Sequence, residues 1–133
     1  MIRILFLCHG NICRSPMAEF IMKDLVKKAG LEQSIQIESA ATSTEEIGNP
    51  VYPPARRKLS EHGIDCSGKR ARQLLNSDYE KYDLLIGMDR ATSPGRLVKS
   101  ISRCILSAKS PPQIRYILRR LARSMPIRRS YFS

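Results

Sequence analysis

Acidic residues are absent from the last third of the sequence. All 12 Asp and Glu residues lie at or before Asp89, where 12 of the 23 Lys and Arg residues balance them. The segment from 90 to 133 contains the remaining basic residues and no acid, so it supplies the whole formal net charge of +11. This break in composition is typical of a basic tail that binds nucleic acid or a membrane surface, or of a segment never selected as protein.

Long apolar runs and paired cysteines are also absent. The apolar run before Cys8 is too short for a signal-peptide core, and no stretch approaches the roughly twenty apolar residues of a membrane span. The four cysteines (8, 13, 66 and 104) lack the paired spacing of zinc ligands. We therefore expect one cytoplasmic domain over residues 1–133, with reduced thiols, no membrane span, no metal and no cofactor. Cys66 and Cys104 are expected to be inert.

Strand and helix patterns alternate through the first part of the chain. Short apolar runs at 2–7 and 82–89 predict buried strands, and the alternation at 34–40 predicts another. Helices are predicted at 16–29, with Ser15 as cap and Gly30 as stop, and from about Pro54 to Gly63. This order predicts an α/β fold in which helices cover both faces of a parallel sheet, giving three layers.

The sequence CHGNICRS, residues 8–15, joins the first strand to the first helix. Ligands bind at the carboxyl ends of strands in such a sheet. Gly10 and Asn11 tolerate the positive φ angles of a tight loop, whose inward N–H groups and following helix N-terminus form an anion site. The planar guanidinium of Arg14 suits two phosphate oxygens.

Cys8 lies at the start of this predicted anion site. The positive field favours its thiolate, which is a nucleophile for in-line displacement at phosphorus. The product is a cysteinyl-phosphate that water hydrolyses. Ser15 is expected to donate a hydrogen bond to the sulfur, stabilising the thiolate.

The stretch LFLCHGNICRSPMAEF resembles the signature of low-molecular-weight protein-tyrosine phosphatases. The stretches SAATSTEEIGNP, ARRKLSEHGI and YDLLIGMD extend the resemblance from residue 2 to about 91. The resemblance implies a sheet of about four strands and a phosphate loop with Cys8 as nucleophile and Arg14 as phosphate and transition-state ligand. The other loop residues it implies are His9, Gly10, Asn11, Ile12, Cys13 and Ser15. Cys13 resembles the family's second cysteine, which bonds to the nucleophile under oxidation; a small core residue is the alternative.

Two related groups share this loop. Arsenate reductases need further cysteines on a mobile segment, and arginine phosphatases carry threonine at the position of Ile12. The apolar Ile12 favours an aromatic substrate, so a phosphotyrosine protein or a small phosphate ester is expected, with inorganic phosphate as product. The family often places an aromatic residue near Glu45; here Tyr52 is the candidate substitute.

The family's general acid, an aspartate before proline near the C-terminus, has no counterpart after Asp89. Losing general acid catalysis typically slows a reaction by about 10² to 10⁴. We expect impaired hydrolysis; a phosphate-binding protein without turnover, or an interaction protein that uses the basic tail, are the alternatives. The segment 115–123, RYILRRLAR, is a candidate basic amphipathic helix for an acidic partner. Specific nucleic-acid binding is not expected.

A shifted reading frame from about residue 92 onward is one hypothesis for the divergent tail. With one permitted choice of codons, Ser124 to Arg128 contains Asp-Ala-Asp-Pro in another frame. Restoring one adenine before the Thr92 codon turns Ala91-Thr92-Ser93 into Ala-Asn-Ile, and both repairs use the same phase. Reading the gene across codons 90 to 94 beside a close relative tests this. The same tail, in frame, in relatives would contradict it.

Overall fold

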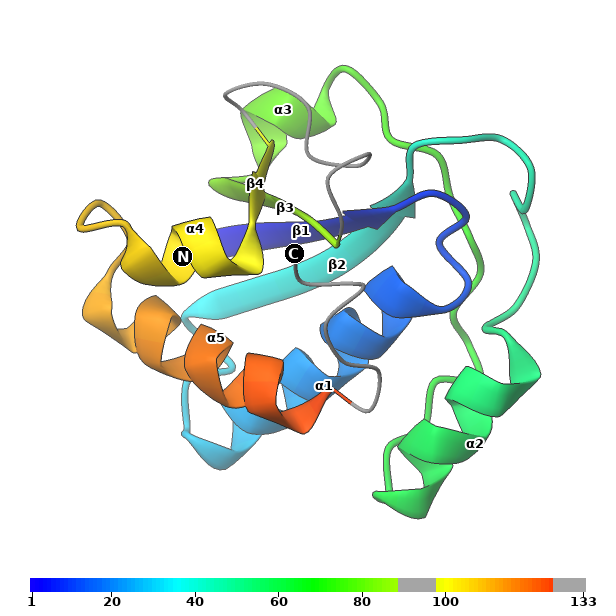
Figure 1. Ribbon diagram of the computed structural model, residues 1–133, viewed down its shortest axis with the longest axis horizontal. Helices are drawn as coiled ribbons and strands as arrows, with labels where there is room; N and C mark the ends of the chain where they lie inside the picture. Colours follow the sequence, from blue (N-terminus) through cyan, green and yellow to red (C-terminus); the bar gives the residue numbers. More distant parts are fainter. Residues whose placement is uncertain (89–97, 126–133) are drawn as a thin grey trace.

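The computed structural model describes residues 1–88 and 98–125 (Figure 1). Its elements in chain order are β1 (Ile2–Cys8), α1 (Arg14–Lys28), β2 (Ile35–Ala41), α2 (Pro53–Glu61), α3 (Asp78–Lys81), β3 (Leu84–Gly87), β4 (Val98–Ser100), α4 (Ile101–Leu106) and α5 (Pro112–Ser124). The four strands pair in parallel in the order β2-β1-β3-β4. The predicted α/β fold with a four-stranded parallel sheet is therefore confirmed.

The central strand β1 is apolar and buried from Ile4 to Cys8 because both faces of the sheet are covered there. Ile4 and Phe6 pack in a large cluster with residues of α1 and α5, whereas Leu5 and Leu7 pack in a smaller cluster with Tyr82. Figure 1 shows α1 and α5 on one face of the sheet and the short α3 on the opposite face. This arrangement gives the three predicted layers and explains an unbroken apolar run where an exposed strand would alternate.

The start of α1 corrects the prediction for Ser15. The helix begins at Arg14, and Cys13 occupies the cap position without a side-chain hydrogen bond to the helix. Ser15 lies inside the helix, and its hydroxyl contacts the sulfur of Cys8 instead of capping the helix. The predicted stop at Gly30 is confirmed by its φ of 72°. Tertiary contact at the loop has thus overridden the local capping preference of serine.

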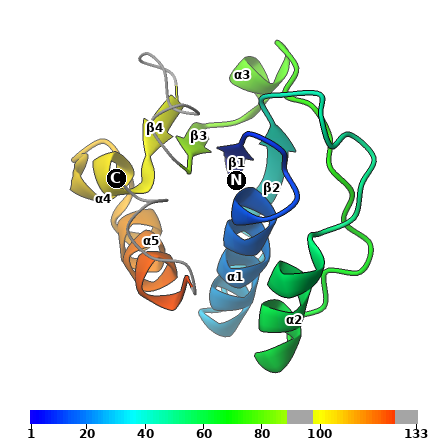
Figure 2. The same ribbon diagram turned by 45° about the vertical axis from the view of Figure 1, so that its right-hand side comes forward.

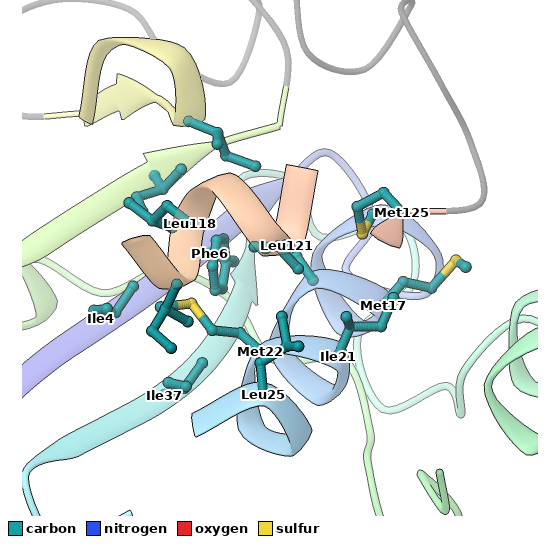
Figure 3. Close-up of a cluster of buried hydrophobic side chains, with 14 of the residues drawn as sticks. Ile4, Phe6, Met17, Ile21, Met22, Leu25, Ile37, Leu118, Leu121 and Met125 are labelled. Atoms are coloured by element: carbon teal, nitrogen blue, oxygen red, sulfur yellow. The ribbon is translucent and has the colours of Figure 1, made fainter. Parts of the chain in front are cut away.

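Part of the basic tail is built into the fold. Residues 98–125 form β4, α4 and α5, and β4 completes the sheet beside β3. Helix α5 packs against α1 in the larger core cluster, where Leu121 and Met125 lie beside side chains of α1 and Leu118 lies near Phe6 of β1 (Figure 3). The predicted amphipathic helix is confirmed, but its apolar face belongs to the core. Asp89 and residues 92–97 lie outside the described residues.

Helix α1 lies between α5 on one side and α2 on the other (Figure 2). Met125, after α5, lies near Met17 in the first turns of α1, while Tyr116 and Ile117 of α5 share a cavity with Lys28 at the other end of α1. The two helices therefore run in opposite directions. Among residues 1–88 and 98–125, no helix has the length and apolar character needed to cross a membrane.

Candidate active site

The loop of residues 8–15 lies at the carboxyl end of the sheet, where β1 ends and α1 begins. Cys8 is the last residue of β1 and is only 2% exposed. Arg14 is the first residue of α1 and is half-buried. The loop thus places Cys8 beside the N-terminal end of a 15-residue helix, where the helix dipole favours negative charge.

Two hydrogen-bond donors converge on the sulfur of Cys8. The Oγ atom of Ser15 lies 3.0 Å from Sγ, which confirms the contact predicted for Ser15. The backbone N–H of Asn11 donates to the same sulfur over 3.2 Å. The sulfur of Cys8 is therefore a hydrogen-bonded atom and not only part of the apolar core.

The backbone of the loop depends on Asn11 and Gly10 in different ways. Asn11 has a φ of 59°, as predicted, and this left-handed conformation directs its N–H toward Cys8. The prediction of positive φ was wrong for Gly10, which does not adopt it. Space beside Gly10 is limited instead, because a Cβ atom there would lie 3.3 Å from Cγ of Glu46, whose side chain would have to shift.

The side chain of Asn11 holds the loop to the rest of the protein. Its Nδ2 donates to Oγ of Ser15 over 2.7 Å and to Oγ of Ser39 over 2.9 Å. Its Oδ1 accepts from the backbone N–H of Arg72 over 3.2 Å. Because Ser15 already accepts from Asn11, its own hydroxyl proton is available for the sulfur of Cys8. The network therefore presents the hydroxyl to Cys8 as a donor.

The network continues from Ser39 to the buried carboxylate of Glu19. The Ser39 hydroxyl donates to Oε1 of Glu19 over 2.5 Å. Lys23 donates to Oε2 over 2.6 Å, and Nζ of Lys69 lies 3.5 Å from Oε1. Burial lowers the pKa of Lys69, and the charge of Glu19 opposes this shift. Glu19 is thus a buried acidic side chain. Hydrogen bonds through Ser39, Asn11 and Ser15 connect it to the sulfur of Cys8.

The exposed rim of the loop carries the remaining predicted residues. Nε2 of His9 lies 2.9 Å from Oε2 of Glu45, and both side chains are more than half exposed. The carbonyl of Ile12 accepts from the backbone N–H of Tyr52 over 2.7 Å, which places Tyr52 next to the loop.

Cys13 is half-buried against the larger core cluster. Burial, reinforced by Cys8, raises the pKa of the Cys13 thiol, and Arg14 opposes the shift.

The family model described as "Low molecular weight phosphotyrosine protein phosphatase" matches residues 3–102. The chain belongs to this family. The match extends beyond residue 91, to which the sequence resemblance was traced, and ends within α4.

Curated relatives in this family match about two thirds of the chain. The low molecular weight protein-tyrosine-phosphatase YfkJ of Bacillus subtilis is 46% identical over 89 residues, which is 67% of this chain and 57% of the relative. The Gallus gallus phosphatase is 42% identical over 88 residues, which is 66% of this chain and 55% of the relative. The matched region thus spans just over half the length of these relatives.

Solved structures of the family match a larger share of the chain. The crystal structure of Bacillus subtilis YfkJ has a TM-score of 0.74 at 32% identity, covering 93% of this chain and 94% of that one. The low molecular weight phosphatase from T. tengcongensis has a TM-score of 0.71 at 28% identity, covering 91% and 92%. The family fold thus extends beyond the region of higher sequence identity.

The sequence interpretation missed the residues outside the loop that are hydrogen-bonded into its network. Glu19 was read only as favourable to the helix dipole, and Ser39, Lys69 and Arg72 were not singled out. The signal for Glu19 was its place in α1 among buried residues, since an unpaired carboxylate is rarely buried. Ser39 and Lys69 come from distant segments, and only the fold brings them to Glu19.

The other two cysteines lie away from the loop. Cys66 is 3% exposed and Cys104 is fully buried, and both thiols are free. Burial raises the pKa of each thiol. Burial and a raised pKa both disfavour reaction, in agreement with the expectation that these cysteines are inert. No group of three His, Cys, Asp or Glu side chains in the described ranges is arranged to hold a metal ion.

Proposed function

We propose that the chain hydrolyses phosphate monoesters as a protein-tyrosine phosphatase, with Cys8 as the nucleophile and residues 1–133 as one domain. The observation that carries the proposal is the pair of donors, Ser15 Oγ and the N–H of Asn11, directed at the sulfur of Cys8. A buried cysteine needs no such donors to pack as an apolar residue. Donors at 3.0 and 3.2 Å prepare the sulfur for negative charge.

The reaction proceeds in two displacements at phosphorus. The loop at residues 9–13 and the guanidinium of Arg14 bind the phosphoryl oxygens, and Arg14 also neutralises charge in the transition state. The thiolate of Cys8 attacks phosphorus, so that a sulfur–phosphorus bond forms as the bond to the ester oxygen breaks. Water then attacks phosphorus, releasing inorganic phosphate and the thiolate. Ser15 stabilises the sulfur as nucleophile and as leaving group.

The substrate is a phosphotyrosine-containing protein or a small aryl phosphate. Ile12 supplies an apolar wall beside the phosphate, and Tyr52, which is 47% exposed next to the loop, supplies a second. Glu45 is paired with His9 at the rim, so it orients His9 there and does not contact an aromatic ring. We propose that the reaction needs no cofactor and that the enzyme acts in the cytoplasm.

The leaving group departs with little help from a general acid. The sequence holds no acidic residue after Asp89, and Asp89 itself lies outside the described residues. A tyrosine oxygen is a poor leaving group without a proton, whereas nitrophenolate leaves readily. Loss of the acid typically slows the first displacement by about 10² to 10⁴, so phosphotyrosine is the more affected substrate.

Rapid-quench kinetics test the proposal. Purified chain is mixed with p-nitrophenyl phosphate or with a phosphotyrosine peptide, beside the Cys8→Ser variant. We expect a burst of nitrophenolate that the variant lacks, and slower release of tyrosine. Nitrophenolate release that survives Cys8→Ser would exclude Cys8 as the nucleophile.

The second candidate function is phosphate binding without turnover. It is favoured by the same combination of a formed loop and a missing acid. Calorimetric titration with inorganic phosphate, together with the absence of any burst, would identify it.

A further inference from the structure

Four arginines and one tyrosine lie on the polar side of α5, which we call the basic α5 face; all are exposed except Arg115, which is half-buried. Its residues are Arg115, Tyr116, Arg119, Arg120 and Arg123. In the described part of the chain none of these arginines has an acidic partner, and residues 98–125 contain no Asp or Glu. The face therefore has an uncompensated positive charge.

The spacing of the arginines concentrates this charge. Arg115, Arg119 and Arg123 recur every fourth residue and form one ridge about 12 Å long, given a rise of about 1.5 Å per residue. Like charges at this spacing repel each other. An anionic partner would relieve the repulsion, whereas the free protein keeps it.

The opposite side of α5 limits how a partner can bind. Ile117, Leu118 and Leu121 are at most 1% exposed and pack in the core with α1. The helix therefore has no free apolar side to insert into a bilayer or to occupy the groove of a partner protein. Contact is confined to the charged ridge and the groove beside it.

A groove beside the ridge has the chemistry of a phospholipid headgroup site. It is a cavity of about 220 Å³ between α5 and the end of α1. Leu25, Ala29 and Ile117 line it with apolar atoms, while Lys28, Tyr116 and Arg120 supply polar groups. Asp24 is the acidic group at this end of α1 and pairs with Lys28 over 2.8 Å, which leaves Arg120 as the uncompensated cation.

Tyr116 favours a membrane over a nucleic acid as the partner. It is 53% exposed, and its hydroxyl accepts a hydrogen bond from Nη1 of Arg120 over 3.2 Å. An exposed tyrosine with its polar end held beside a cation suits the headgroup region of a bilayer. A single tyrosine with its ring near Arg120, 5.9 Å away, is a poor platform for successive bases.

We propose that the basic α5 face docks the protein on a membrane surface rich in anionic phospholipid. The ridge contacts phosphate groups, and the groove accepts one headgroup between Tyr116 and Arg120. The groove lies at the end of α1 opposite Cys8. The proposal does not depend on phosphatase activity.

Vesicle sedimentation with the full chain tests this proposal. Vesicles of phosphatidylcholine, alone or mixed with phosphatidylglycerol, are spun down with the protein at low and high salt. We expect binding only to the mixed vesicles, and loss of binding at high salt. The variant Arg115→Gln/Arg119→Gln/Arg123→Gln should bind roughly a hundredfold less, since each basic residue at such a surface contributes roughly fivefold.

A variant of equal net charge is the matched control. Arg56→Gln/Arg57→Gln/Lys58→Gln removes three exposed charges from α2, on the other side of α1. It should keep most of the binding; an equal loss would overturn the proposal in favour of net charge alone. Circular dichroism shows whether each variant is folded. If the triple variant of α5 is unfolded, the single variant Arg119→Glu, at an exposed position, replaces it.

A competition experiment separates the two kinds of anionic partner. A mixed-sequence RNA oligonucleotide is added to the vesicle mixture at matched phosphate concentration. Retention of the protein on the vesicles supports the proposal. Complete transfer to the RNA, or equal binding to vesicles of phosphatidylcholine alone, would overturn it.

Discussion

The hydroxyl of Ser15 lies 3.0 Å from the sulfur of Cys8, although the two residues are seven positions apart and stand at opposite ends of the loop. The contact forms because the loop returns the chain to the end of β1 as α1 begins. Asn11 fixes its direction, since its amide already donates to the Ser15 oxygen. The hydroxyl of Ser15 is therefore directed at the sulfur of Cys8, and no side chain caps the start of α1.

Ser15→Ala should slow the reaction and make Cys8 less reactive. A hydrogen bond to a charged group contributes about 1.5–3 kcal/mol, so we expect kcat/KM for p-nitrophenyl phosphate to fall by about 10- to 100-fold. Alkylation of Cys8 by iodoacetate at neutral pH should slow as well. Ser43→Ala, which removes a hydroxyl bonded to the carbonyl of His9, is the control and should leave alkylation unchanged. Equal effects of the two changes would remove Ser15 from the proposed role.

Glu19→Gln should destabilise the protein and weaken the loop together. The substitution leaves the buried ammonium of Lys69 beside a neutral group, with the carbonyl of Ser39 as its remaining partner, and a buried charge that loses its counter-charge costs about 1–3 kcal/mol or more. Urea denaturation should show this loss, with a fall in kcat as the network loosens. Glu32→Gln, at an exposed position, serves as control. Unchanged stability would mean that the Glu19 carboxylate is not the support of the network.

Asp78 should make the protein sensitive to acid. Although burial opposes it, hydrogen bonds from Arg72 and from the N–H of Leu75 lower the pKa of Asp78 below its ordinary 3.8. A carboxyl group whose pKa is lower in the folded state stabilises the protein fully above pH 3.8. That contribution disappears as the pH falls through the folded-state value. Asp78→Asn should lower the free energy of unfolding at neutral pH and make it depend less on pH below 4. Urea denaturation at several pH values measures this. The same pH dependence below 4 in the variant and the wild type would contradict the prediction.

Cys13 should protect Cys8 from irreversible oxidation. Peroxide converts Cys8 to a sulfenic acid, and the Cys13 thiol then forms a disulfide with release of water. Wild-type activity should return with dithiothreitol, whereas Cys13→Ala should stay inactive after the same treatment. Cys66→Ala is the matched control. Equal recovery of all three proteins would leave Cys13 as a packing residue.

Helix α5 should be required for stability in spite of its unusual composition. Leu118 is fully buried in the core, and replacing a buried leucine by alanine typically costs about 2–5 kcal/mol. Leu106→Ala removes the same atoms from a side chain that is 82% exposed and should have little effect. Thermal melting of the two variants compares them directly. Similar melting temperatures would mean that α5 does not pack on α1 in solution.

The local sequence determined the elements around the loop and the residues within it. An unbroken apolar run predicts a doubly covered strand, and the glycine, asparagine, arginine and cysteine of residues 8–15 carry their chemistry wherever the loop is placed. Tertiary structure alone decided that Ser15 contacts a sulfur instead of capping a helix, and that Gly10 lies close to the side chain of Glu46. It also brought Ser39 and Lys69 to Glu19 and assigned the apolar side of α5 to the core. Each of these depends on contacts between segments distant in sequence, and local propensity does not contain that information.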